Sequence, residues 1–444
     1  MDKIAIIGAG LAGCECALAL ARSGISCVIF EQKPACKSPA HVSDLFSELV
    51  CSNSLRSDEA TSAVGLLKME MRALDSPFMK AADECRVPAG KALAVNREEF
   101  ALTITRQILN NPHIKVITRQ IQSLDDPALL PYKTVVLAAG PLASSPLAEN
   151  LAAEIGAEHC YFYDAIAPIV WTSSLNMDIV FRASRYAQDS ADEGDYLNCP
   201  MDREEYLRFH EALCAGQTAA AHNFEKEIHF EGCMPIEALA ARGPRTLSFG
   251  PLKPVGLVDP RTGKRPWAVL QLRAESRNGD ACNLVGCQTK LLQSEQRRIF
   301  SLVPGLEKAE FMRYGSMHRN TYINAPRVLN PDLSLKSRPN IFIAGQISGV
   351  EGYVESAASG LWLANFLERR ARGGTLPPLP PTTALGSLLS HLQNPARHFQ
   401  PSNATFGLMP EPETPTRKKD RKAFYACRAR AAFAEWLHLA RQAF

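Results

Sequence analysis

The sequence has no long apolar run, no Cys-x-x-Cys pair and little net charge. No stretch approaches the roughly 18–20 apolar residues that span a bilayer, so we expect no membrane association. The thirteen cysteines are scattered and odd in number, which argues against a disulfide framework or a zinc knuckle and predicts no metal site. The first residues lack the basic segment and cleavage site of an export signal. These absences predict a protein of the reducing cytoplasm.

The formal net charge is only +3 over 444 residues. A nucleic-acid partner would therefore have to be bound by local basic patches rather than by the field of the whole molecule. Hydrophobic residues make up 46% and charged residues 21% of the chain, a composition typical of globular proteins. A chain of this length predicts two or three domains.

The first residues predict a dinucleotide-binding unit. Residues 4–13 read "IAIIGAGLAG", an apolar strand that runs into a G-x-G-x-x-G turn. The three glycines allow the tight turn, the close approach of the backbone to a pyrophosphate and the close packing of helix on strand. A helix and a second strand follow, and an acid at the end of that strand accepts the ribose hydroxyls of the adenosine. We therefore assign cofactor contacts to Gly8, Ala9, Gly10, Leu11, Ala12, Gly13 and Glu31.

A late segment favours FAD over NAD. Residues 340–366 read "NIFIAGQISGVEGYVESAASGLWLANF", a strand, a Gly-rich loop and a helix rich in small residues. In two-part flavoproteins such a unit returns to the nucleotide domain, although an ordinary βα unit would read the same way. Residues 134–145, "TVVLAAGPLASS", form another strand that ends in a turn, and the chain has no second G-x-G-x-x-G for a nicotinamide domain. The further cofactor contacts predicted from these segments are Gly140, Gly345, Gln346, Gly349 and Tyr353.

The predicted fold class is α/β, with a Rossmann-type FAD-binding domain and an inserted α+β substrate domain. We place the FAD-binding domain at 1–158 and 326–372, the insertion at 159–325, and a Pro-rich connector with a basic helical tail at 373–444. Residues 417–444 carry eight Lys or Arg against two acids, with aromatic residues between them. This tail is either a surface helix packed by one face or a patch that follows an RNA backbone.

Two cysteines stand in contexts unlike the others. "ELVCSNSLRSDE" puts Cys51 before turn formers and hydrogen-bond donors. "FEGCMPI" sets Cys233 between a glycine and a Met-Pro pair, with Arg242 and Arg245 downstream, and guanidinium groups near a thiol favour its nucleophilic thiolate form. Each cysteine, taken alone, is either a packed apolar residue or a nucleophile on a loop. Core packing is the expected role of Cys14, Cys16, Cys27, Cys282 and Cys287.

Several long stretches match a known family: "GAGLAG", "VCSNSLRSDE", "FYDAIAPIV", "FEGCMPIE", "ARGPRTLSFGPLKPVGL", "LVGCQTKL" and "AGQISGVEGYVESAASG". On these residues the chain resembles, nearly from end to end, the folate- and FAD-dependent tRNA (uracil-5-)-methyltransferases (TrmFO). The larger GidA/MnmG flavoproteins, which modify the tRNA wobble uridine, look related.

The resemblance implies methylation of carbon 5 of a uridine in the tRNA T-loop. Methylenetetrahydrofolate would supply the carbon, and FADH2, regenerated by NADPH or NADH, the reducing equivalents. Cys233 takes the position of the thiolate that adds to carbon 6 of uracil and makes carbon 5 nucleophilic. Cys51 matches the family's second reactive cysteine beside the flavin, with a role in removing the proton from carbon 5 or in handling the one-carbon unit. We expect a monomer or weak oligomer.

RNA contacts are expected at Arg242, Arg245 and Lys253, with Lys264 and Arg265 as further candidates. Each of them also reads as an ordinary solvated charge on a loop. Three other functions stay open at this point. They are the same chemistry on a uridine of large-subunit rRNA, a flavin oxidoreductase that needs no RNA, and a non-catalytic RNA-binding flavoprotein.

Overall fold

The structure is a computed structural model. It describes residues 2–38, 40–156, 160–185, 194–219, 234–276, 278–395, 399–412, 417 and 420–442; for 160–165, 318 and 319 it describes the backbone only.

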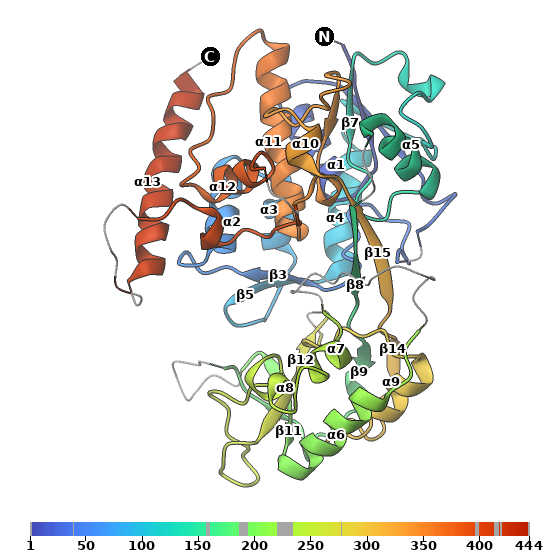
Figure 1. Cartoon of the computed structure of the whole chain (residues 1–444), viewed down its shortest axis with the longest axis vertical. Coiled ribbons are helices and arrows are strands. Elements are labelled where there is room, and N and C mark those ends of the chain that lie inside the picture. Colours follow the sequence, from blue (N-terminus) through green and yellow to red (C-terminus); the bar gives the residue numbers. More distant parts are fainter. Residues whose placement is uncertain are drawn as a thin grey trace.

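Five parallel strands form the first sheet, in the order β16-β7-β1-β2-β6. Their bounds are β1 Ile4–Ile7, β2 Cys27–Glu31, β6 Ile114–Thr118, β7 Thr134–Leu137 and β16 Ile341–Ile343. Short sequences such as "IAII" and "IFI" are buried throughout, as expected for parallel strands that helices cover on both faces. The late strand β16 pairs with β7 inside this sheet, so the chain leaves the first half of the molecule and returns to it (Figure 1).

Helices α1 (Leu11–Arg22) and α11 (Tyr353–Ala371) pack against each other at a distance that only glycine allows. A Cβ at Gly360 of α11 would lie 2.3 Å from the carbonyl oxygen of Ala12 in α1. A Cβ at Gly13 would lie 2.0 Å from the carbonyl oxygen of Gly8, which itself has a φ of +100°. The glycine turn, the first helix and the returning helix are therefore fixed together in one rigid unit.

A second, six-stranded sheet has the order β10-β11-β12-β13-β9-β14, and all its neighbouring strands are antiparallel. Its strands are β9 Ile169–Trp171, β10 Phe181–Arg182, β11 Tyr196–Met201, β12 Ala268–Ala274, β13 Ala281–Leu284 and β14 Phe311–Arg313. Its helices are α6 Arg203–Ala215, α7 Ile236–Ala240, α8 Thr246–Phe249 and α9 Gln293–Phe300. The sheet has its own hydrophobic core, separate from that of the first half. A ribbon of two antiparallel strands, β8 (Cys160–Ala165) and β15 (Met317–Tyr322), connects the halves (Figure 1).

A small third sheet lies on the first half, in the order β3-β5-β4. Its strands are β3 Ser54–Ser57, β4 Arg86–Val87 and β5 Ala92–Val95, and the helices around it are α2 Ala63–Ala73, α3 Pro77–Glu84 and α4 Arg97–Leu109. The other helices are α5 Ser145–Ile155, α10 Ala325–Val328 and α12 Ala384–His391. Because β3 begins three residues after Cys51, the small sheet fixes one side of the loop that carries this cysteine.

The basic tail forms helix α13 (Arg421–Gln442), which lies against the first half (Figure 1). Its apolar stripe is buried, including Tyr425, Phe433 and Trp436, and the indole N–H of Trp436 donates to the Pro377 carbonyl oxygen at 2.9 Å. These three rings therefore cannot stack on bases, and the helix packs by its apolar face against the first half. In the described part of the chain, no helix combines the length and the apolar character needed to cross a membrane.

The first sheet takes its strands from residues 4–137 and 341–343, and the second from residues 169–313. The α/β class with a Rossmann-type parallel sheet is confirmed. The domain limits at 158, 325 and 372 stay a prediction.

The variant Gly360→Ala is expected to melt at a lower temperature than the wild type. The added methyl group must push α11 away from the Ala12 carbonyl, and overpacking of this kind costs roughly 1–3 kcal/mol. Gly374→Ala is the matched control, because its Cβ would meet the nearest atom, the Arg369 carbonyl oxygen, at 3.7 Å. Thermal unfolding followed by circular dichroism compares them, and equal melting temperatures for the two variants would contradict the tight helix contact.

Candidate active site

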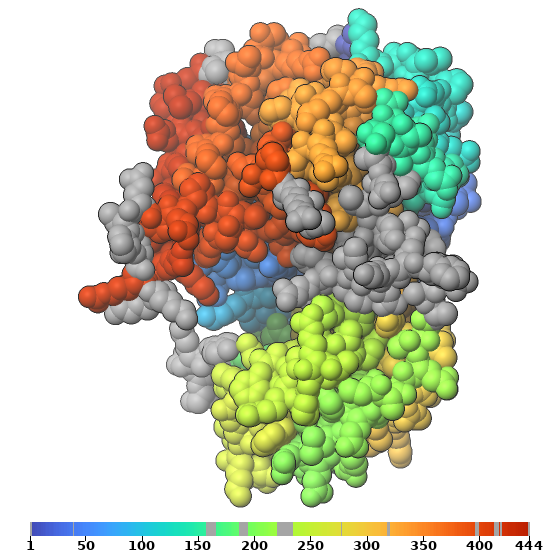
Figure 2. All heavy atoms as spheres, viewed as in Figure 1, coloured from blue at the N-terminus to red at the C-terminus, as the bar shows by residue number. Residues whose placement is uncertain are grey.

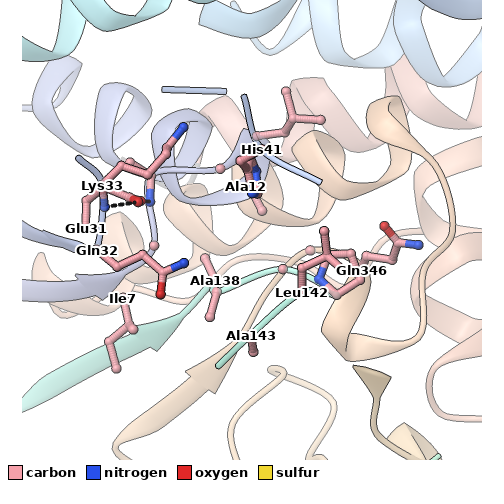
Figure 3. A pocket seen from close by; sticks show the side chains of 18 of the residues that line it. Ile7, Ala12, Glu31, Gln32, Lys33, His41, Ala138, Leu142, Ala143 and Gln346 are labelled. Carbon is pink, nitrogen blue, oxygen red and sulfur yellow. Dashed lines mark hydrogen bonds between the residues drawn. The ribbon is translucent and has the colours of Figure 1, made fainter. Parts of the chain in front are cut away.

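A pocket opens at the carboxyl ends of strands β1, β2, β7 and β16, the edge where doubly wound folds bind their ligands. The space between its atoms amounts to about 1070 Å³, open solvent at its mouth included. Figure 3 shows Glu31 at one end of the pocket and Gln346 at the other, with Ala138 between them. The pocket is therefore elongated across the switch point between β1 and β7.

Most of the predicted cofactor residues line this pocket. They are Gly8, Ala9, Gly10, Leu11, Ala12, Glu31, Gly140, Gly345, Gln346 and Tyr353. Gly13 and Gly349 are not among the lining residues. Gly13 serves the contact between helix α1 and the glycine turn, and Gly349, with a φ of +100°, makes a turn against the Phe399 ring.

The glycine-turn end of the pocket is suited to an anion. Gly10 caps helix α1, and no described side chain makes a capping hydrogen bond to this helix or adds an acid to its first turn. A Cβ at Gly10 would meet no described atom within 4 Å, so a ligand has space to approach the backbone there. N–H groups at a helix N-terminus attract phosphate groups. Glu31 faces the same turn and accepts hydrogen bonds from the N–H groups of Ala9 at 2.6 Å and Lys33 at 2.9 Å.

Sequence reasoning missed residues 33–38 and 40–48, several of which line one wall of the pocket. The Ser47 N–H donates to the Ala9 carbonyl oxygen at 2.9 Å, and the Lys33 ammonium lies 3.9 Å from the Glu48 carboxylate. Burial, followed by the charge of Lys33, lowers the pKa of His41, so its ring is neutral at pH 7. The segment contains no periodic pattern or glycine motif that would have marked it in the sequence.

Tyr353, the first residue of α11, connects the pocket to Cys51. The Cys51 N–H donates to the Tyr353 hydroxyl oxygen at 2.7 Å, and the Cys51 Sγ lies 2.8 Å from the same oxygen. The Ser52 N–H donates to it at 3.3 Å. Burial, together with the neighbouring Cys51, raises the pKa of Tyr353 well above its usual range, so the phenol stays protonated. Because its oxygen already accepts two N–H groups, the hydroxyl is free to donate to Sγ, and such a bond would favour a negatively charged sulfur.

Arg97, the first residue of α4, holds the loop that carries Cys51. Its Nη1 donates to the Leu49 carbonyl oxygen at 2.9 Å. Its Nε and Nη2 make two further bonds to the Glu275 carboxylate, at 2.6 and 3.1 Å. Glu275 follows directly on β12 of the second sheet. Arg97 therefore ties the cysteine loop of the first half to the second half of the molecule.

Two arginines of the second sheet reach the same loop. Arg273 of β12 donates to Ser52 Oγ at 2.8 Å, and Arg313 of β14 donates to the Val50 carbonyl oxygen at 3.0 Å. Burial lowers the pKa of both guanidinium groups, which nevertheless stay charged at neutral pH, and each of them interacts electrostatically with Cys51. Positive charge beside a cysteine favours the thiolate, which is its nucleophilic form.

These arginines were not predicted, although one of them carries a signal in the sequence. Arg273 interrupts the apolar strand "AVLQLRA", and a charge in a strand that is otherwise buried must find partners inside the protein. Arg97 and Arg313 lie in segments of mixed polarity and carry no such mark.

The other predicted packing cysteines are buried in the structure, as expected: Cys14, Cys16, Cys27, Cys282 and Cys287. Burial raises the pKa of Cys14 and of Cys27 to about 12, which keeps both thiols protonated and unreactive. Cys51, in contrast, is half-buried. Across the described ranges, no three His, Cys, Asp or Glu side chains are grouped so that they could hold a metal ion.

The remaining predicted site residues are Cys233 and three basic residues. Cys233 lies outside the described residues. Arg242 and Arg245 are exposed and Lys253 is half-buried, all of them between α7 and β12. The structure therefore places Cys51 against Tyr353 of the pocket lining, and the three predicted RNA residues lie in a separate segment of the second half.

Comparisons with known proteins give consistent results. A family model described as "Glucose inhibited division protein A" matches residues 3–375. A relative from Nitratidesulfovibrio vulgaris (Hildenborough) is 61% identical over 433 residues, which cover 98% of this chain and 91% of the relative. Relatives from Oleidesulfovibrio alaskensis and Geobacter sulfurreducens are 60% and 53% identical, and each alignment covers 98% of the relative. All three are named "Methylenetetrahydrofolate--tRNA-(uracil-5-)-methyltransferase TrmFO".

Among solved structures, a crystal form of Aquifex aeolicus GidA superposes with a TM-score of 0.68 at 15% identity. The match covers 98% of this chain and 74% of the GidA chain. At this level of identity the match shows a shared fold.

The parallel sheet, the pocket and the returning helix define the class of protein. It is a Rossmann-type FAD-binding fold with a second, antiparallel unit inserted into it. The similar proteins then identify the family within this class. The chain belongs to the TrmFO family, within the wider GidA family, and the resemblance noted in the sequence is confirmed.

The variant Arg273→Gln is expected to slow the alkylation of Cys51 by iodoacetamide at pH 7 by roughly threefold or more, because it removes a positive charge that favours the thiolate. Glutamine keeps a neutral hydrogen-bond donor at this position in place of the guanidinium group. Peptide mass spectrometry measures the modification of Cys51, with exposed Cys427 as the internal reference. Arg86→Gln, which removes a guanidinium paired with Asp58 away from the loop, is the control. Equal rates in both variants would contradict the electrostatic role of Arg273.

Proposed function

We propose that this protein methylates carbon 5 of a uridine in the T-loop of tRNA. Methylenetetrahydrofolate is the carbon donor and FADH2 the reductant. One observation carries the proposal: Tyr353 lines the dinucleotide pocket and at the same time contacts the backbone and sulfur of Cys51. A flavin pocket and a reactive thiol thus share one side chain in a chain that belongs to the TrmFO family.

The residues of the pocket fit FAD. The glycine turn and the N-terminus of α1 would hold the pyrophosphate, and Glu31 would accept the ribose hydroxyls of the adenosine. Gly345, Gln346 and Tyr353 at the other end would face the isoalloxazine ring. The space that Gly10 leaves open suits a phosphate group, because any larger residue would place a side chain in it.

The one-carbon unit of methylenetetrahydrofolate must gain two electrons to become a methyl group, and bound FADH2 supplies them. NADPH or NADH would restore the reduced flavin. The chain provides no second G-x-G-x-x-G motif for the nicotinamide. We therefore propose that the nicotinamide reaches the flavin through the same pocket opening.

Two cysteines are needed because carbon 5 of uracil is a poor nucleophile. A thiolate that adds to carbon 6 creates an enolate and makes carbon 5 reactive. We assign this addition to Cys233. Cys51, held by Tyr353 and surrounded by guanidinium groups, either removes the proton from carbon 5 or handles the one-carbon unit beside the flavin. The reacting uridine must leave its loop to reach this site, as is general for enzymes that act on a base.

The partner is tRNA, with first contacts proposed at Arg242, Arg245 and Lys253. We propose that the protein works in the cytoplasm as a monomer or weak oligomer.

The proposal is tested by incubating the full chain with unmodified tRNA transcript, FAD, NADPH and methylenetetrahydrofolate labelled in its one-carbon unit. Position-specific RNA analysis should find the label in one 5-methyluridine of the T-loop. Large-subunit rRNA is the second substrate arm. Label in rRNA alone would show that the same reaction acts on a different RNA. NADPH oxidation at the same rate with and without RNA would favour a flavin oxidoreductase.

Cys51→Ala and Cys233→Ala are each expected to lower methyl transfer by at least about a thousandfold, because each removes a group that acts on uracil or on the one-carbon unit. Both proteins should keep the yellow colour of bound flavin. Cys36→Ala, which changes an exposed cysteine, is the control and should keep full activity. Loss of flavin from Cys233→Ala would show that this residue is structural.

Glu31→Ala is expected to weaken FAD binding by about tenfold or more, because a charged acceptor for the ribose hydroxyls is lost. Flavin fluorescence during titration of the apoprotein measures the affinity. Glu98→Ala changes an acid in the first turn of α4, outside the pocket lining, and is the matched control. Unchanged affinity in Glu31→Ala would place the adenosine elsewhere.

A further inference from the structure

Residues 241–267, called the basic surface below, connect α7 to β12 on the second half of the molecule. They contain six Lys or Arg residues and one acid, Asp259, so their net charge is six minus one, or +5. Asp259 is occupied by Arg261 of the same segment, at 2.8 Å. The side chains of Arg242, Arg245, Lys264 and Arg265 are exposed. In Figure 2 the segment is yellow-green and forms part of the visible face of the lower half.

Two aromatic rings are exposed on the basic surface, and a guanidinium group covers each of them. Phe249 is 70% exposed and Trp267 is 43% exposed. The guanidinium carbon of Arg245 lies 4.8 Å from the centre of the Phe249 ring, and that of Arg203 lies 5.7 Å from the Trp267 ring. Stacked rings and guanidinium planes are the platforms on which proteins bind unpaired bases.

The basic surface has a direct structural connection to the candidate active site. Trp267 immediately precedes strand β12, and Arg273 near the other end of that strand contacts Ser52 beside Cys51. Six residues of strand span about 20 Å. This corresponds to about six stacked nucleotides at 3.4 Å each. One RNA molecule can therefore reach both places at once.

The positive charge of the basic surface favours RNA over a protein partner. Exposed Val255 and Val258 would also suit a protein partner, above all a second copy of this chain. A symmetric dimer, however, would place the same patch of charge +5 against itself. A polyanion meets no such repulsion, and stacking rings favour a polyanion that carries bases. The tail helix suits stacking less well, because its Tyr425, Phe433 and Trp436 rings are buried in the first half.

We propose that the basic surface binds the RNA substrate outside the reacting uridine. Phosphates lie on Arg242, Arg245, Lys264 and Arg265, and unpaired bases stack on Phe249 and Trp267. This inference rests on the proposed function for the identity of the RNA. To the proposed function it adds the surface that binds the RNA and the stacking of unpaired loop bases on two aromatic rings.

The test measures binding of a fluorescently labelled, unmodified tRNA transcript to the FAD-loaded full chain at several salt concentrations. The charge variant combines Arg242→Gln, Arg245→Gln, Lys264→Gln and Arg265→Gln. It is expected to reduce the slope of log K against log [salt] by about three, since each lost phosphate contact removes about 0.7–0.9. Its matched control changes four lysines of the first half to glutamine (Lys37, Lys80, Lys91 and Lys133) and should keep the slope.

The stacking variant combines Phe249→Ala and Trp267→Ala. It is expected to weaken tRNA binding at least about tenfold, as lost base stacking requires, while the salt slope stays unchanged. Trp171→Ala, which removes another exposed tryptophan of the same sheet, is the control and should bind like the wild type. Melting temperature and flavin absorbance, measured for every variant, show that each protein is folded.

Several outcomes would overturn the inference. One is that the charge and stacking variants bind tRNA as tightly as the wild type does. Another is that the wild type is a dimer and the stacking variant is a monomer. Competition by poly-glutamate as strong as that by tRNA would assign the surface to an acidic protein partner. The proposed function fails separately. If tRNA is bound with the predicted salt and stacking dependence but is not methylated, the RNA-binding surface is supported and the proposed methylation is contradicted.

Discussion

An ionic contact between the two halves of the molecule, the pair formed by Arg97 and Glu275, helps to hold the loop that carries Cys51. The two side chains are 17% and 10% exposed, their closest atoms lie 2.6 Å apart, and the same guanidinium group holds the Leu49 carbonyl. Because both side chains are largely shielded from solvent, removing one partner leaves the other charge without compensation. The second half is therefore held in one arrangement where it meets the cysteine loop.

This contact joins the dinucleotide-binding half to the second half beside the cysteine proposed as catalytic. The first half alone supplies a dinucleotide pocket and a returning helix, α11, which close glycine contacts lock to α1. Tyr353 begins that helix and contacts Cys51. The second half adds Arg273 and Arg313, whose charges favour the thiolate. Strand β12 carries Arg273 and starts next to the basic surface, so the segment proposed for RNA binding runs directly into the strand that contacts the cysteine loop.

Features encoded by short local patterns were predictable from the sequence. The glycine spacing, the acid at Glu31 and the late strand–loop–helix unit each have a local physical cause, and the structure brings them to one pocket. The arginines around Cys51 were not predictable, because residues about 45 to 260 positions away in the chain meet only through the pairing of sheets. Only Arg273 could have been singled out from the sequence, because it is a charged residue in an otherwise apolar strand. The segment 33–48 had no pattern at all.

The central claim is that the flavin pocket and Cys51 form a single site. A crystal structure of the full chain with bound FAD tests it most directly. The account predicts the adenosine at Glu31 and the isoalloxazine ring at the end formed by Gln346 and Tyr353, in contact with the Cys51 loop. A ring at the Glu31 end, or one separated from Cys51 by other side chains, would contradict it.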